Sequence, residues 1–137
     1  MTASSSALMD TDTLSAIMRG NSSATERARS YLKAHRQFTF SILTRYEILR
    51  GLLAKKAARQ LVTFGQLCAT SRVLPLTDAI VVQGAAIYAD LLRRGELIND
   101  ADILIAATAI VHGLAVVTNN EKHFRRMRDL QIENWLA

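Results

Sequence analysis

NDADILIAATAI, at residues 99–110, is the stretch around which the fold of this chain is organised. From Ile103 onward nearly every residue is apolar and three are alanine, and a helix that is apolar on all sides is normally packed on all sides. The same helix begins with two acids, Asp100 and Asp102. Acids at this end suit the positive end of the helix dipole, which stabilises each by roughly 0.3–1 kcal/mol. Asp102 is therefore either a first-turn acid or a metal ligand held at the mouth of a buried helix.

The length and composition predict one globular domain. The chain has 137 residues, half of them hydrophobic, which is enough to bury a core. No apolar run approaches the roughly 20 residues that span a membrane. Residues 1–7 lack a signal-peptide pattern and are interpreted as a disordered tail, which leaves residues 8–137 as a single domain. The single cysteine, Cys68, can form no internal disulfide, and we expect a cytoplasmic protein.

The charge balance favours a polyanionic partner. Seventeen lysines and arginines stand against 12 acids, for a formal charge of +5, and a basic surface attracts phosphates through counterion release. A basic chain that places several acids at the ends of its elements suggests metal ions acting on a phosphate.

Strands alternate with helices along the chain. Apolar runs predict strands at residues 8–9, 38–42, 73–76 and 114–118, with a possible last strand at Ile132. Helical spacing and terminal signals predict helices that end at Gly20, near His35 and Leu53, and at Gly95, besides the one at residues 99–110 and a short basic one at residues 121–128. Thr77 is expected to cap the helix that ends at Gly95, and the inner face of that helix is expected to carry Ile80, Val81, Gly84, Ile87, Tyr88 and Leu91. This order predicts a three-layer α/β domain with a mostly parallel sheet of four to five strands. Ligands bind at the carboxyl edge of such sheets, where Asp10 and the turn at residues 118–120 are expected.

The segment at residues 44–67 is interpreted as a helical hairpin. Thr44 and Glu47 fit a capping box at the start of its first helix, with Leu43 and Ile48 as a hydrophobic staple. A second helix follows almost at once. The apolar ridges of such a hairpin serve either the core or a partner.

Three acids stand out as candidate ligands. Asp10 follows the first strand, whereas Glu47 and Asp102 lie in first helical turns, and each has a local explanation as a cap or a dipole partner. If the fold brings them together, two carboxylates about 4 Å apart repel by roughly 4 kcal/mol at an effective dielectric of 20. Such a cluster needs a shared proton or a divalent cation. Oxygen ligands without His or Cys select Mg²⁺ or Mn²⁺.

Other chemistries lack their motifs. His35, His112 and His123 have no zinc-like spacing. The sequence contains no glycine-rich phosphate loop, no GxSxG elbow and no GxGxxG fingerprint.

Four segments resemble the motifs of PIN-domain proteins. LMDTDTLSAIMRG (residues 8–20) is similar to their opening motif, in which a strand delivers DTN or DTD into a helix. TRYEILRGL (residues 44–52) resembles the second motif, and NDADILIAATAIVHGLAVVTNNEKHF (residues 99–124) resembles the third and fourth. The closing ENW (residues 133–135) also fits. The resemblance spans nearly the whole chain from Leu8 and is nearest to the VapC-type toxins of bacterial toxin–antitoxin modules.

The resemblance implies a metal-dependent endoribonuclease on a parallel sheet flanked by helices. By position, Asp10, Glu47 and Asp102 would be its acidic triad and its ligands for Mg²⁺, which Mn²⁺ could replace. The fourth position, often an aspartate in the family, is Asn120, which leaves open whether one or two metal ions bind. Attack by an activated water would break the P–O3′ bond and leave a 5′-phosphate. The implied partners are an RNA such as a tRNA or another structured RNA, an antitoxin on the helical hairpin, and a second copy in a homodimer.

Supporting roles follow by position. Asp12 and Thr118 would line the site, and Asp100 would cap its helix. Arg19, Arg45 and Lys122 are candidates for contacts with the RNA backbone. The arginines and lysine on the outer face of the helix at residues 22–35 are expected to be solvated rather than to contact phosphate.

Two alternatives differ in class. The first is a catalytically weak PIN-like module that binds RNA or an antitoxin without cutting, which Asn120 favours and the three retained acids oppose. The second is a phosphoacceptor receiver domain, which would need an aspartate after a middle strand. The segment at residues 72–77 contains no acid, which opposes that alternative.

Overall fold

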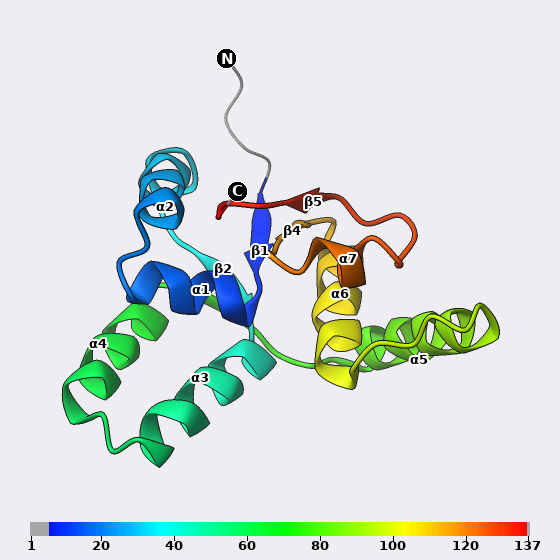
Figure 1. The fold of residues 1–137 in the computed structure, drawn as a ribbon, viewed down its shortest axis with the longest axis horizontal. Helices are drawn as coiled ribbons and strands as arrows, with labels where there is room; N and C mark the ends of the chain where they lie inside the picture. Colours follow the sequence, from blue (N-terminus) through cyan, green and yellow to red (C-terminus); the bar gives the residue numbers. More distant parts are fainter. Residues whose placement is uncertain (1–5, 137) are drawn as a thin grey trace.

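A computed structural model describes residues 6–136 and shows a five-stranded, fully parallel sheet with helices on both faces (Figure 1). The strands are β1 (Ala7–Met9), β2 (Thr39–Ser41), β3 (Arg72–Leu74), β4 (Ala115–Val117) and β5 (Ile132–Glu133), in the order β3-β2-β1-β4-β5. The predicted α/β fold class is confirmed. Of the predicted tail, residues 1–5 lie outside the described residues, whereas Ala7 is the fully buried first residue of β1.

Seven helices flank the sheet within residues 6–136. On one side lie α1 (Thr11–Met18), α2 (Ser22–His35), α3 (Ile42–Ala54) and α4 (Ala58–Ala69), and on the other α5 (Asp78–Arg93), α6 (Asp100–His112) and α7 (Glu121–Phe124). Figure 1 shows α3 and α4 as the predicted hairpin, and α6 between the sheet and α5. Within the described part of the chain no helix is both long and apolar enough to cross a bilayer.

The two faces of the sheet support separate cores. Leu8 of β1 and Val116 of β4 point toward α5 and α6, whereas Met9 and Val117, their neighbours in sequence, point toward α1–α4. This alternation is the period of two that strands impose. It explains why α6 is apolar on all sides, because it packs on the sheet with one face and on α5 with another.

Gly84 allows α5 and α6 to approach closely. A Cβ atom at Gly84 would lie 3.0 Å from Cδ2 of Leu104, which is tighter than ordinary packing. The inner face of α5 is narrower than the sequence predicts, since Ile80, Ile87 and Leu91 are buried but Val81 and Tyr88 are exposed. The predicted basic helix at residues 121–128 is also shorter, because α7 ends at Phe124.

Three helix starts depend on caps that the sequence only partly reveals. The predicted cap at Thr77 is confirmed by the Ile80 N–H that its hydroxyl accepts. The predicted capping box at Thr44 and Glu47 is wrong, because α3 begins at Ile42 and Ser41 caps it. Asp100 does not cap α6 either; its neighbour Asn99 does, by accepting the N–H of Asp102 at 2.9 Å.

Candidate active site

The predicted site residues meet at the carboxyl edge of the sheet, where β1 and β4 lie side by side. Asp10 follows β1, and its backbone N–H donates to the carbonyl of Val117 at the end of β4 at 3.0 Å. In the sheet, β2 lies on one side of β1 and β4 lies on the other, so the strand order reverses at β1. Such a reversal creates a crevice at the carboxyl ends of the two neighbouring strands. A cavity of about 240 Å³ occupies it. We call it the acidic cavity, and its lining residues are Asp10, Thr11, Asp12, Glu47, Asn99, Asp102 and Asn120.

Asp10 is the most deeply buried acid of the cavity. Its side chain is 4% exposed and caps α1 by accepting the N–H of Thr13 at 2.8 Å. Burial raises the pKa of this carboxyl from 3.8 to about 6, although hydrogen bonds from Thr118 and Thr13 oppose the shift. The charge of Asp12 adds to it. Ionised Asp10 is therefore held at a cost that a nearby cation would relieve.

Glu47 is the acid that α3 contributes to the acidic cavity. With Ser41 as the cap, Glu47 lies in the second turn rather than the first, and its carboxylate points toward α1. The Thr11 hydroxyl donates to Glu47 Oε1 at 2.7 Å and lies 3.1 Å from the buried Thr44 hydroxyl. Arg50 is 3.8 Å from the other carboxylate oxygen, but its side chain is mostly exposed, so this pair contributes little.

Asp102 lies at the start of α6, with Asn99 and His123 around its carboxylate. The Asn99 amide donates to Asp102 Oδ2 at 3.1 Å, and His123 Nδ1 is 3.5 Å from the same oxygen. Burial raises the pKa of Asp102, hydrogen bonds from Asn99 and His123 oppose this, and the charge of Glu47 adds to it. The Asn120 amide nitrogen is 2.8 Å from His123 Nδ1, so Asn120 and Asp102 share one imidazole partner.

Thr11, Thr44, Asn99 and His123 are site residues that the sequence analysis missed. Thr11 stands directly after Asp10, and a hydroxyl at that position is the one signal that could have indicated it. The contact of His123 with Asp102 joins two helices far apart in sequence and follows only from the fold. Asp12 and Thr118 are both predicted to line the site. Asp12 lines the acidic cavity, and the Thr118 side chain forms a hydrogen bond with Asp10.

The carboxylate oxygens of the cavity suit a hard cation, although the three carboxylates do not converge on one position. Asp10, Glu47 and Asp102 offer only oxygen atoms, the ligands that Mg²⁺ and Mn²⁺ prefer. Within residues 6–136, no three Asp, Glu, His or Cys side chains converge closely enough to hold one ion. Thr11 holds Glu47, and Asn99 and His123 hold Asp102, so an ion would have to compete with these partners. Burial is the main cause that raises the pKa of both aspartates, and a cation bound beside them would oppose it.

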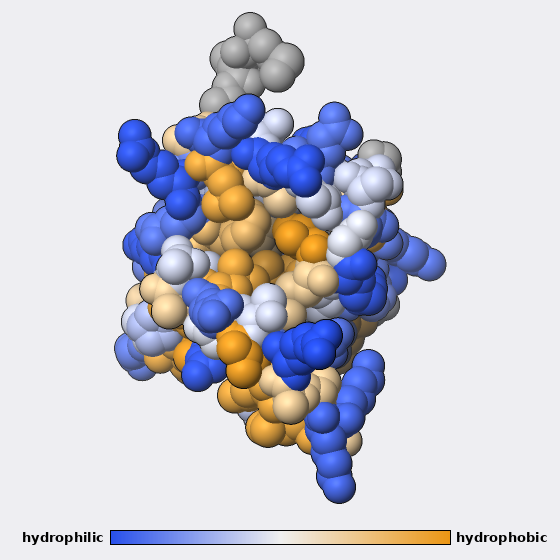
Figure 2. Space-filling view, turned by 90° about the vertical axis from the view of Figure 1, so that its left-hand side faces the viewer, coloured by the Kyte–Doolittle hydropathy of each residue, from blue (hydrophilic) through white to orange (hydrophobic). Residues whose placement is uncertain are grey.

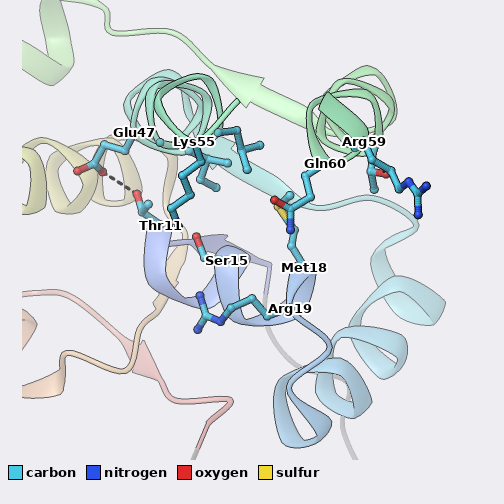
Figure 3. Close-up of a pocket in the computed structure, with 12 residues that line it drawn as sticks. Thr11, Ser15, Met18, Arg19, Glu47, Lys55, Arg59 and Gln60 are labelled. Carbon is cyan, nitrogen blue, oxygen red and sulfur yellow. Dashed lines mark hydrogen bonds between the residues drawn. The ribbon is translucent and has the colours of Figure 1, made fainter. Parts of the chain in front are cut away.

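A second cavity of about 390 Å³ continues from the acidic cavity between α1, α3 and α4 (Figure 3). We call it the basic groove because Arg19, Lys55 and Arg59 line it, and Thr11 and Glu47 belong to both cavities. Figure 2 shows apolar surface in a hollow ringed by hydrophilic side chains on the side of the molecule that carries α2 and α4. Of the basic residues predicted to contact RNA, Arg19 lines this groove, whereas Arg45 and Lys122 line neither cavity.

Comparison with known proteins gives consistent matches. The family model of the PIN domain matches residues 7–130. Ribonuclease VapC1 of Methanocaldococcus jannaschii is 34% identical over 93 residues, which cover 68% of this chain and 66% of that protein. The tRNA(fMet)-specific endonuclease VapC of Salmonella typhimurium is 36% identical over 63 residues, which cover 46% of this chain and 48% of that protein. The matched segments thus span less than two thirds of these relatives.

A solved structure extends the match to nearly the full chain. The crystal structure of DNA-bound VapBC from Salmonella typhimurium superposes with a TM-score of 0.85 and 25% identity, and covers 96% of this chain and 99% of that one.

Proposed function

The chain belongs to the PIN domain family, and on that premise we propose that it is a metal-dependent endoribonuclease that acts as the toxin of a toxin–antitoxin pair. The observation that carries the proposal is the acidic cavity, where one carboxylate directly after β1, one from α3 and one from α6 line a single space at the sheet edge. The ribonuclease names of the relatives support the reaction class.

Asp10, Glu47 and Asp102 are the proposed ligands of Mg²⁺, for which Mn²⁺ could substitute. When bound, the ion would supply positive charge beside the phosphodiester and acidify a water molecule. The three carboxylates would hold the ion in the acidic cavity, where their negative charge favours a cation. Asn120 adds an amide but no charge, and its contact with His123 orients the imidazole against Asp102.

Glu47 lies at the junction of the two cavities, with one oxygen held by Thr11. Its other oxygen either binds a second metal ion or accepts a proton from the attacking water, and in a site with one ion we assign it the role of proton acceptor. The water oxygen bonds to phosphorus while the P–O3′ bond breaks. The products are a 5′-phosphate and a 3′-hydroxyl, whose oxygen takes a proton from solvent.

Replacement of Thr11 by valine should lower the rate of RNA cleavage about tenfold. Valine keeps the volume of the side chain but removes the hydroxyl that fixes Glu47, and a hydrogen bond to a charged group contributes about 1.5–3 kcal/mol. Single-turnover cleavage rates measure the effect. A Thr11→Ser variant keeps the hydroxyl and should cleave at the wild-type rate, so equal losses in both variants would argue against this positioning.

The proposed substrate is a structured RNA such as a tRNA, cut in an unpaired loop. Sequence-specific recognition of RNA mostly targets unstacked bases in loops. One relative is named as specific for tRNA(fMet), which supports this class of substrate. The proposed place of action is the cytoplasm, where such RNA is found.

The proposed partner is an antitoxin that binds the α3–α4 hairpin and covers the acidic cavity. The similar structure from Salmonella typhimurium is a VapBC assembly, which supports a partner of this kind. The hairpin also carries exposed apolar side chains, among them Leu53 and Val62.

One experiment tests the ribonuclease proposal. The purified protein is incubated with total tRNA in Mg²⁺ or in EDTA, and the 5′-phosphate ends are sequenced. We expect discrete new ends in Mg²⁺ only. If the protein binds the RNA but does not cleave it in Mg²⁺, the alternative of a catalytically weak binding module is favoured. Asn120 at the fourth acidic position supports that alternative.

We further propose a homodimer through the outer face of α5. Val81, Ala85, Tyr88 and Leu92 form one exposed stripe at helical spacing along this helix. Light scattering should give the mass of a dimer for the wild type and of a monomer for a Leu92→Arg variant. A wild-type monomer at micromolar concentration would contradict the proposal.

A further inference from the structure

We propose that the basic groove holds the RNA strand next to the bond that is cut, as a subsite for one unpaired nucleotide and its phosphate. The inference rests on the proposed ribonuclease function and states where its substrate lies. Because the groove shares Thr11 and Glu47 with the acidic cavity, a strand with its scissile phosphate at the carboxylates can continue directly into the groove.

The charges of the groove are complementary to a polyanion. Arg19, Lys55 and Arg59 line it against a single acid, Glu47, at the shared end. Within residues 6–136 none of these three cations forms an ion pair, in contrast to Arg94 and Arg125 elsewhere on the surface. Figure 3 shows Arg19 running back along α1 as far as the level of Ser15, whereas Arg59 lies at the other end of the groove and points away from Thr11 and Glu47. Cations that no carboxylate neutralises are available to phosphate oxygens.

The floor and wall of the groove suit a base rather than phosphate alone. Met18, Ile48 and Leu52 supply apolar surface on which a base can lie. The side chains of Ser15 and Gln60 form no hydrogen bond among the described residues, so both can contact the edge of a base. Unpaired bases are recognised by this combination of a flat contact and hydrogen bonds to their edges. The volume of about 390 Å³ lies in the range of small-ligand sites.

An RNA strand fits these features better than a peptide does. A peptide could also cover the apolar floor, but three cations without a carboxylate partner complement the charge of an RNA strand. The groove also opens into the cavity where the phosphodiester bond would be cut, which a peptide would not require.

The test measures RNA binding and cleavage by variants of the groove. In an Asp10→Asn background, which leaves the RNA uncut, the affinity for a fluorescent single-stranded 12-nucleotide RNA of mixed sequence is followed by anisotropy as a function of salt. We expect Arg19→Ala and Arg59→Ala each to weaken binding about threefold to tenfold, and to lower the slope of log Kd against log salt by about 0.7, the value for one lost phosphate contact with a single strand. Gln60→Ala should leave the slope unchanged. Lys33→Ala on the exposed face of α2 removes the same charge and should change neither quantity.

Cleavage in the wild-type background separates the two proposals. Gln60→Ala should alter the preference for the base beside the cut bond about tenfold, as expected for the loss of a base-edge contact. A wild-type protein that cuts no RNA in Mg²⁺ contradicts the ribonuclease function itself. If the wild type cuts RNA but the groove variants behave like Lys33→Ala, the subsite is contradicted and the ribonuclease function is not. A peptide would then be the favoured occupant of the groove.

Discussion

An Asp10→Asn variant should lose RNA cleavage by at least about a thousandfold and yet resist unfolding better than the wild type at pH 7.5 without metal. The loss follows because the variant lacks the most buried carboxylate of the acidic cavity. The gain follows because burial raises the pKa of Asp10 from 3.8 to about 6, so the ionised form destabilises the fold. A shift of this size corresponds to about 3 kcal/mol. Asparagine keeps the cap of α1, since Asn21 and Asn99 cap α2 and α6 in the same way.

The same shift fixes the pH dependence. The folded-state pKa of Asp10 lies above the unfolded one, so the folded protein binds more protons between pH 4 and 6. The free energy of unfolding of the metal-free wild type should therefore fall as the pH rises through this window. The advantage of Asp10→Asn should be absent at pH 3.5, reach its full value by pH 7 and remain constant above it. Urea unfolding at several pH values measures the difference, and a variant less stable than the wild type at pH 7.5 would contradict the account of Asp10.

A Trp135→Ala variant should lower the free energy of unfolding by about 3–5 kcal/mol, the range for removal of a large buried aromatic side chain. Trp135 is 1% exposed and lies 5.4 Å, between ring centroids, from Tyr31 of α2. The Tyr31 hydroxyl in turn bonds the backbone of Ala7 in β1. The side chain thus joins the chain after β5 to α2 and, through Tyr31, to the central strand.

Chemical denaturation measures this loss. Trp135→Phe retains most of the buried ring and should lose much less than the alanine variant. If Trp135→Ala lost less than about 1 kcal/mol, the segment after β5 would not contribute to the core as the structure indicates.

The sequence predicts the elements well because their signals are local. The apolar helix at residues 99–110, the cap at Thr77 and the alternating apolar runs all follow from the periodicity of neighbouring residues. The start of α3 was predicted wrongly because Thr44 and Glu47 match a capping box while Ser41, at the end of a strand, gives a weaker signal. Val81 and Tyr88 are expected on the inner face of α5 but are exposed in the structure. Periodicity shows that a helix has an apolar face, but it does not show how wide the buried part of that face is.

The candidate site was predictable in its acids but not in its supports. Asp10, Glu47, Asp102 and Asn120 follow from motif positions, and the fold brings all four to one cavity. The partners of these acids come from elsewhere in the chain: Thr11 of α1 supports Glu47 of α3, and His123 of α7 contacts Asp102 of α6. No local pattern encodes such pairs, and their catalytic roles stay predictions.

The most direct test of the account is a titration of the protein with Mg²⁺, with thermal unfolding followed at pH 7.5. An ion that binds only the folded state stabilises it by RT ln(1 + [L]/Kd), or about 1.4 kcal/mol at ten times Kd. We predict a saturable rise in the unfolding temperature of the wild type that EDTA reverses. The rise should be lost in Asp10→Asn and reduced in Glu47→Gln and Asp102→Asn. A wild type that does not respond to Mg²⁺ or Mn²⁺, or a rise of equal size in all four proteins, would contradict the claim that these carboxylates form a cation site.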